Sequence, residues 1–136
     1  MSEALKIAVS GLNDAVLRVV NVASNVVNSL STSRLPEKPG GNATGYQPQD
    51  VVTLSDSAGD NLLGVSSTVQ AREPAFFVAS DPESPNANAA GLVAAPNVDI
   101  PAELLNAKLA EVAYKANAAV IRAAEKNDKE LLDTLA

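Results

Sequence analysis

The chain has 136 residues, a formal net charge of -6 and few aromatic side chains, with no tryptophan, cysteine or histidine. Without cysteine and histidine it has no disulfide, no thiolate nucleophile and neither of the side chains that most often bind zinc or act as a general base, which excludes most classes of enzyme. Its lysines and arginines are scattered rather than clustered, so neither nucleic acid nor an anionic membrane is an expected partner.

The N-terminal residues give no sign of a secretory signal. Residues 1–4 lack a basic region followed by an apolar run and a cleavage site, so no cleaved signal is expected. The most apolar stretch, residues 15–30, is interrupted by Arg18 and three asparagines and is too short and polar to span a bilayer, so direct membrane insertion is not expected.

Small side chains bury little area each, so the monomeric core should be thin and stability should depend on packing against further helices.

A long helix is predicted over residues 2–30, and at 1.5 Å per residue it would be roughly 42 Å long. Ser2 suits its N-cap and Glu3 suits the positive end of its dipole. Its apolar residues recur in alternating steps of four and three, which is the heptad seam of a coiled coil. The seam consists of Leu5, Val9, Leu12, Val16, Val19, Ala23, Val26 and Leu30.

Three valines lie outside this seam, Val20, Val22 and Val27. They make the later half of the helix apolar over more of its circumference than one partner helix would cover, which is typical of a helix buried from several sides. The alternative is a loosely packed hairpin of two helices with some exposed valines.

A column of asparagines follows the same helix at positions 21, 25 and 28. This i, i+4, i+7 spacing places Asn21, Asn25 and Asn28 on one face. Buried among neighbouring helices, their amides would fix axial register, as a buried asparagine does in coiled coils. An exposed polar stripe is the alternative.

Residues 31–98 hold seven of the eight prolines and six of the seven glycines, a composition that stops helices. Strands are expected at 46–54, 63–71 and 75–79, joined by turns at 55–61 and at Glu73-Pro74. Asp56 and Asp60 lie in the first turn but lack the spacing of a calcium loop. Residues 33–44 and 81–90 should be flexible surface loops unless a partner orders them.

A second long helix is predicted over residues 99–136. Asp99 suits its N-cap and Pro101 is tolerated in its first turn. A heptad pattern continues through a four-residue stutter, at which the helix should unwind locally. The pattern comprises Leu105, Leu109, Val112 and Ala116, and then Val120, Ala124, Asn127, Leu131 and Leu135.

The predicted fold is therefore mainly α. An N-terminal helix (1–32) and a C-terminal helix (99–136) pair as a coiled coil, and a small irregular β insert (33–98) lies between them. An architecture of two rods argues against a catalytic cleft. No catalytic residue, cofactor site or metal site is predicted.

Four blocks of residues resemble the flagellar basal-body rod protein family, and they occur in the family's order along nearly the whole chain. Residues 18–32 are similar to its A-x-N-x-A-N signature, with Val27 in place of the usual alanine. The other blocks are Gly45-Tyr46 with Val51-Val52; Gly91-Leu92-Val93 with Pro96-Asn97-Val98-Asp99; and Glu103-Leu104-Leu105-Asn106 with Ala113-Tyr114-Lys115-Ala116-Asn117 and Lys126. Leu92 and Val112 also depart from the family pattern.

The resemblance implies a structural subunit of the bacterial proximal rod, a hollow drive shaft built from copies of the chain and other rod proteins. It also implies delivery by the flagellar type III export apparatus without a cleaved signal. The alternatives are a sister subunit of the same rod, a diverged paralogue, or a coiled-coil adaptor or chaperone-like module. The expected assembly residues are Leu12, Val16, Val19, Asn21, Ala23, Asn25, Val26, Asn28, Leu105, Leu109, Val112, Tyr114, Ala116 and Asn117.

Overall fold

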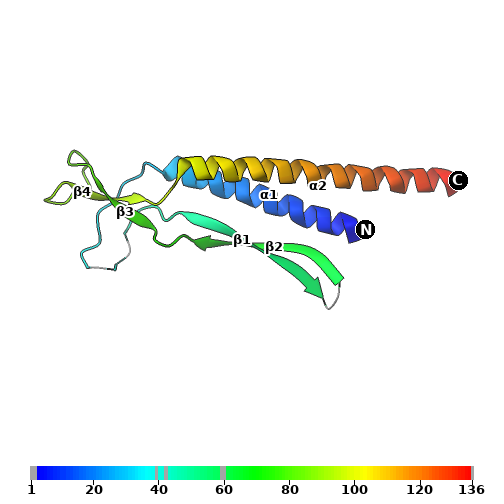
Figure 1. The fold of residues 1–136 in the computed structure, drawn as a ribbon, viewed down its shortest axis with the longest axis horizontal. Helices are drawn as coiled ribbons and strands as arrows, with labels where there is room; N and C mark the ends of the chain where they lie inside the picture. The colour runs from blue at the N-terminus through cyan, green and yellow to red at the C-terminus, as the bar shows by residue number, and fades with distance from the viewer. Residues whose placement is uncertain (1–2, 39, 42, 59–60, 136) are drawn as a thin grey trace. The chain divides into compact units, whose positions relative to one another are not determined.

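The computed structural model describes residues 3–38, 40–41, 43–58 and 61–135 of the chain. Within these residues, two long helices enclose a β insert in the sequence (Figure 1). The elements are α1 (Glu3–Asn28), β1 (Gln49–Ala58), β2 (Asn61–Ala71), β3 (Phe76–Ser80), β4 (Leu92–Pro96) and α2 (Ile100–Leu135). The predicted order of helix, small β insert and helix is confirmed.

The ends of the elements differ from the prediction in places. The N-cap predicted at Ser2 lies outside the described residues, whereas the one predicted at Asp99 is confirmed, because its carboxylate accepts a hydrogen bond from the Ala102 N–H at 3.2 Å. The turn predicted at 55–61 is wrong in extent, since β1 continues to Ala58 and β2 begins at Asn61.

The chain divides into two compact units, and each takes pieces of both helices. The first unit contains Met1–Val20, Val51–Thr68 and Leu105–Ala136, and the second contains Asn21–Asp50 and Val69–Leu104. β1 pairs with β2 in one two-stranded sheet, and β3 pairs with β4 in another.

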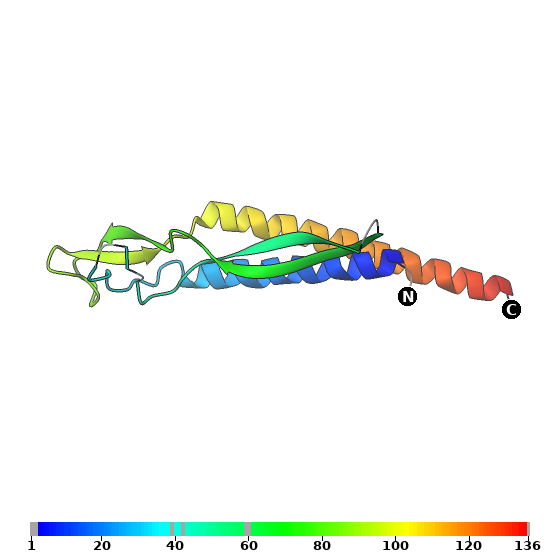
Figure 2. The ribbon, with the colours of Figure 1, turned by 90° about the horizontal axis from the view of Figure 1, so that it is seen from below.

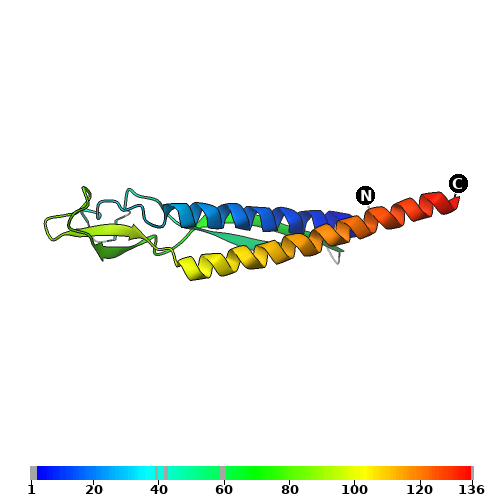
Figure 3. The ribbon, with the colours of Figure 1, turned by 90° about the horizontal axis from the view of Figure 1, so that it is seen from above.

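In the first unit, α1 and α2 run in opposite directions beside each other, and α2 continues past the first turn of α1 (Figures 1, 2 and 3). Small residues allow this approach, since Ala8, Ala15 and Ala110 are buried. A Cβ atom at Gly11 would lie 2.7 Å from Nδ2 of Asn117, so the absence of a side chain at Gly11 lets α1 approach α2 closely. The helices therefore meet through small side chains.

In the second unit, β3 and β4 are antiparallel, with Phe76 opposite Pro96 and Ser80 opposite Leu92. Strand β4 was not predicted. Its residues from Val93 to Pro96 are all buried, so they lack the alternation of apolar and polar side chains that marks a half-exposed strand. Ser33 forms an isolated antiparallel bridge with Ala94 through two backbone hydrogen bonds of 2.9 Å.

The segment between β3 and β4 was expected to be a flexible loop. In the structure it contains its own hydrogen bonds: the Asp81 N–H donates to the Gly91 carbonyl at 2.9 Å, and the Asn88 side chain accepts from the Leu92 N–H at 3.0 Å. The Asn86 amide also donates to the Thr32 carbonyl at 2.9 Å, which connects the loop to the segment after α1.

Candidate assembly surface

Asn25 is the centre of a polar cluster in the second unit, and it is fully buried. Its amide donates to the Gln49 carbonyl and to Oε1 of Glu103, both at 2.9 Å. Its Oδ1 accepts from the Tyr46 hydroxyl at 2.9 Å and from the Gln49 N–H at 3.1 Å. Both amide hydrogens and both lone pairs of the side-chain oxygen are therefore used, so Asn25 connects α1 with the segment from Tyr46 to Gln49 and with α2.

The other two asparagines of the predicted column differ from Asn25. Asn21 is buried and donates to the same Gln49 carbonyl at 2.8 Å, whereas Asn28 is half-buried and donates to the Ser24 carbonyl of its own helix at 2.9 Å. An exposed polar stripe is therefore wrong for Asn21 and Asn25. Their amides bind the start of β1 in the same chain.

Glu103 and Arg72 complete the cluster, although neither was among the site residues expected from the sequence. The buried carboxylate of Glu103 accepts from Nη2 of Arg72 at 2.8 Å, in addition to the Asn25 amide. Arg72 also binds both carboxylate oxygens of Asp50 and donates to the Asn97 carbonyl at 2.9 Å. The hydrogen bonds that Arg72 donates to Asp50 and to Glu103 outweigh burial and raise the pKa of Arg72, so the guanidinium stays charged.

Gly45 precedes Tyr46 because a side chain would not fit there. A Cβ atom at position 45 would lie 2.5 Å from Oγ and 2.7 Å from Cβ of Ser33. Ser33 cannot withdraw easily, since its backbone is held to Ala94. The glycine therefore lets the chain pass Ser33 on its way to the Tyr46–Asn25 hydrogen bond.

Replacing Gly45 with alanine should destabilise the second unit by about 1–3 kcal/mol, the usual cost of overpacking. Ser33→Gly removes the two atoms that the new methyl group would meet, so adding it to Gly45→Ala should recover most of the loss. Urea unfolding of the two single variants and the double variant measures the coupling between the sites. Additive effects would contradict the steric explanation.

The first unit has a polar cluster of its own around Asp14. Its Oδ1 accepts from the hydroxyls of Thr53 at 2.5 Å and Ser67 at 2.6 Å, and its Oδ2 accepts from Nε of Arg18 at 2.9 Å. Arg18 also donates to the Thr53 hydroxyl. Burial acts to raise the pKa of Asp14, but the hydrogen bonds from Arg18, Ser67 and Thr53 outweigh it, and the pKa is lowered.

This lowered pKa predicts how the stability of the first unit depends on pH. A carboxylate with a folded pKa below its unfolded value, about 3.9 for aspartate, stabilises the fold above that value, and the contribution is lost as the pH falls through the folded pKa. The difference in unfolding free energy between wild type and Asp14→Asn should therefore shrink on acidification below about pH 5. Asp128→Asn, at an exposed position of α2, controls for the loss of a charge. A difference that stays constant with pH would contradict the prediction.

The large apolar residues of the predicted heptads lie mostly on the surface of the chain. Val16, Val19, Leu105, Leu109 and Val112 are 43–61% exposed. Ala23 and Ala116 are exposed as well, whereas Leu12, Val26 and Asn117 are half-buried. In the first unit the buried positions of the two helices are alanines, Ala8, Ala15 and Ala110. The exposed residues Leu105, Leu109 and Val112 therefore do not form the seam within one chain that the predicted pairing required.

The first unit has an apolar groove between α1 and α2, with a volume of about 460 Å³, which we call the α1–α2 groove. It is lined by Ala15, Val16, Val19, Val20, Ala107, Glu111, Tyr114 and Lys115. At its rim Glu111 accepts hydrogen bonds from Lys108 and Lys115, which lower the pKa of its carboxyl to about 2. The groove thus combines an apolar floor with an ionic edge.

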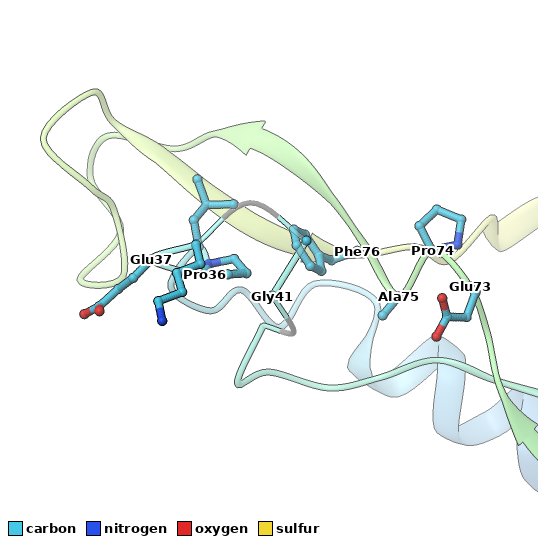
Figure 4. Close-up of a pocket in the computed structure, with 10 residues that line it drawn as sticks. Pro36, Glu37, Gly41, Glu73, Pro74, Ala75 and Phe76 are labelled. Carbon is cyan, nitrogen blue, oxygen red and sulfur yellow. The ribbon is translucent and has the colours of Figure 1, made fainter.

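A second hollow, of about 530 Å³, belongs to the second unit (Figure 4). It is formed by the segment around Pro36, Glu37 and Gly41 on one side and by Glu73 to Phe76 on the other. Its charged side chains, Glu37, Lys38 and Glu73, all come from exposed loop positions. None of the described residues that line it is a buried polar residue that would select a ligand.

Two features of the described residues bear on other functions. Among residues 3–38, 40–41, 43–58 and 61–135, no group of three or more histidine, cysteine, aspartate or glutamate side chains is placed to hold a metal ion. Over the same ranges, neither helix combines the length and the apolar character that crossing a bilayer requires.

Comparison with known proteins identifies relatives by sequence, although no family model matches the chain. The flagellar basal-body rod protein FlgC of Salmonella typhimurium is 32% identical over 118 residues, which cover 85% of this chain and 83% of FlgC. FlgC of Salmonella typhi is similar to the same extent.

Proposed function

The chain belongs to the flagellar basal-body rod protein family as a structural subunit of the rod, and we propose that its copies assemble through the exposed apolar faces of α1 and α2. The observation that carries this proposal is the distribution of side-chain size. Ala8, Ala15 and Ala110 are buried inside the first unit, whereas most of the large apolar residues at heptad spacing are exposed. Burial of apolar area is worth roughly 25 cal/mol per Å², so these faces favour contact with further helices.

We further propose that these contacts lie in the inner, coiled-coil layer of a tube wall. The heptad spacing of Leu105, Leu109 and Val112 suits a seam with a helix of a neighbouring subunit. Other rod proteins are expected neighbours, together with copies of this chain. The exposed members of the expected assembly residues are proposed to contact neighbouring subunits. Asn21 and Asn25 are proposed to support assembly indirectly, because they bind the start of β1 in their own chain.

The chain is proposed to reach the basal body through the flagellar type III export apparatus and to act there without catalysis. The FlgC relatives are named as rod proteins, which favours a structural role over an enzymatic one. Thin packing between α1 and α2 would allow the helical ends to open for export and to order on assembly. Amide exchange of the dilute chain should then show weak protection in residues 3–20 and 105–135, and strong protection there would argue against this order of events.

The proposed function is tested by isolating basal bodies from two strains. In one strain the gene for this chain is deleted, and in the other the chain carries an epitope tag. The tagged chain should copurify with the rod, and the deletion should leave cells without a complete rod and without motility. Motile deletion cells with intact basal bodies would overturn the assignment.

An adaptor or chaperone-like module that binds one partner helix is the second candidate, and the α1–α2 groove is the observation that favours it. Such a module would form discrete complexes. Stable dimers that never extend, measured by light scattering over a range of concentrations, would support it over the rod subunit.

A further inference from the structure

The last part of α2 extends beyond α1 (Figures 1 and 3), and residues 125–135 are called here the α2 tail. All its residues are exposed. Leu131, Leu132 and Leu135 are 62%, 69% and 84% exposed, which is costly for leucine on a helix in water. The tail therefore has an apolar face that the described part of its own chain does not cover.

This apolar face continues the face of α2 that packs within the chain. Ala110, Asn117, Ala124 and Leu131 follow one another at seven-residue intervals, so they lie on the same side of the helix. Ala110 is buried, Asn117 and Ala124 are half-buried, and Leu131 is exposed. Leu131 is the first large apolar side chain among these four positions and is exposed, which indicates a different partner surface at the tail.

The α1–α2 groove offers a surface that suits this tail. Val16, Val19 and Val20 form its α1 side and are all exposed, and Tyr114 lies on the α2 side. Grooves of this kind receive amphipathic helices through anchors at i and i+4, the spacing of Leu131 and Leu135. Leu132 lies beside these two residues and widens the contact.

The charges of the two surfaces are complementary. The tail carries Glu125, Asp128, Glu130 and Asp133 against Lys126 and Lys129, which gives four acidic and two basic side chains and a net charge of -2. Among the charged residues that line the groove, Lys115 offsets Glu111, and Lys108, which lies beside the groove and also binds Glu111, brings the net charge there to +1. Both lysine side chains are largely exposed. Charge attraction would therefore favour contact between a tail and a groove over contact between two tails, which carry the same negative charge.

We propose that the α2 tail of one copy docks in the α1–α2 groove of a second copy. This contact rests on the assembly proposed above and names the surfaces that make it. The two surfaces differ, so the contact is heterologous and leaves a free tail and a free groove at the ends of any assembly. Such a contact repeats along a ring or helix of subunits, whereas a two-fold contact would stop at a dimer.

The absence of cysteine from the chain makes a direct test possible. The double variant Val19→Cys/Leu132→Cys places one thiol in the groove and one on the apolar face of the tail. Val19→Cys/Glu130→Cys is the matched control, because position 130 points away from the three leucines. Both variants are expressed as the cell's copy of the chain, basal bodies are isolated with and without mild oxidation, and the products are separated without reducing agent.

We expect a ladder of covalent multimers from Val19→Cys/Leu132→Cys and at least fivefold less from the control. Val19→Cys/Leu135→Cys should repeat the ladder and replaces the first variant if Leu132→Cys prevents assembly. Intact rods that contain the variants without a ladder would overturn the docking proposal and leave the rod function standing, as would equal linkage at position 130. Absence of the unmodified, tagged chain from basal bodies would overturn the rod function and the docking proposal with it.

Discussion

Arg72→Met is expected to lower the unfolding free energy of the second unit by about 3–5 kcal/mol, the cost of leaving a buried charge without its partner. Without the guanidinium, the Glu103 carboxylate would keep the Asn25 amide but lose its counter-charge. The Asn97 carbonyl would lose a donor as well. Urea unfolding of the isolated chain, followed by circular dichroism, measures the change.

Two further variants separate the buried charge pair from the exposed one. The side chain of Asp50 is 50% exposed against 3% for Glu103, so Asp50 can be hydrated when its pair with Arg72 is broken. Asp50→Asn should therefore cost less than about 1 kcal/mol. Arg72→Met combined with Glu103→Leu removes both charges and should regain much of the loss, as replacing a buried pair by apolar residues often does. A full loss that persists in the double variant would contradict the charge argument.

The helices were predictable because their signals are local. Apolar spacing marked α1 and α2, and Asp99 marked the beginning of α2 through cap chemistry that involves residues only three positions away. Strand β4 was missed because Val93 to Pro96 owe their strand conformation to pairing with β3 and to burial. A short run of small residues before a proline carries no period from which a strand can be recognised.

The polar cluster was predictable in part. The spacing placed Asn21 and Asn25 on one helix face, and the resemblance drew attention to Tyr46 and to the block that contains Glu103. The spacing did not reveal that Asn25 and Glu103, 78 positions apart, share a hydrogen bond, or that Arg72 neutralises Glu103. Contacts between distant segments depend on the fold, and a single sequence shows only which polar side chains will need a partner.

The heptad positions show the same division between local and distant information. Their period identified helical faces suited to packing, and that conclusion depends on the residues of one helix. The surface that covers those faces belongs to another segment or another molecule, which the residues of one helix do not reveal. In this chain Gly11 and the buried alanines hold the two helices together, so the leucines and valines stay available for contacts outside the chain.

Val19→Asp is expected to abolish rod assembly and motility while leaving the fold of the isolated chain nearly unchanged. Val19 is exposed in the single chain, so an aspartate there stays hydrated and should change the unfolding free energy by no more than about 0.5 kcal/mol. In an assembled wall the same carboxylate would be buried against a neighbouring subunit without a partner, which costs several kcal/mol for each contact. Ala116→Asp, also exposed in the single chain, should behave in the same way.

Asn13→Asp is the matched control, since it adds the same charge at an exposed position of α1 outside the predicted seam. Cells that produce Asn13→Asp should assemble rods and swim, whereas cells that produce Val19→Asp should export the chain, which then fails to enter the basal body. Normal motility with Val19→Asp would show that this face of α1 stays in water in the rod. Because the two variants have equal charge and differ in the face that carries it, a difference between them must arise from contacts that form on assembly.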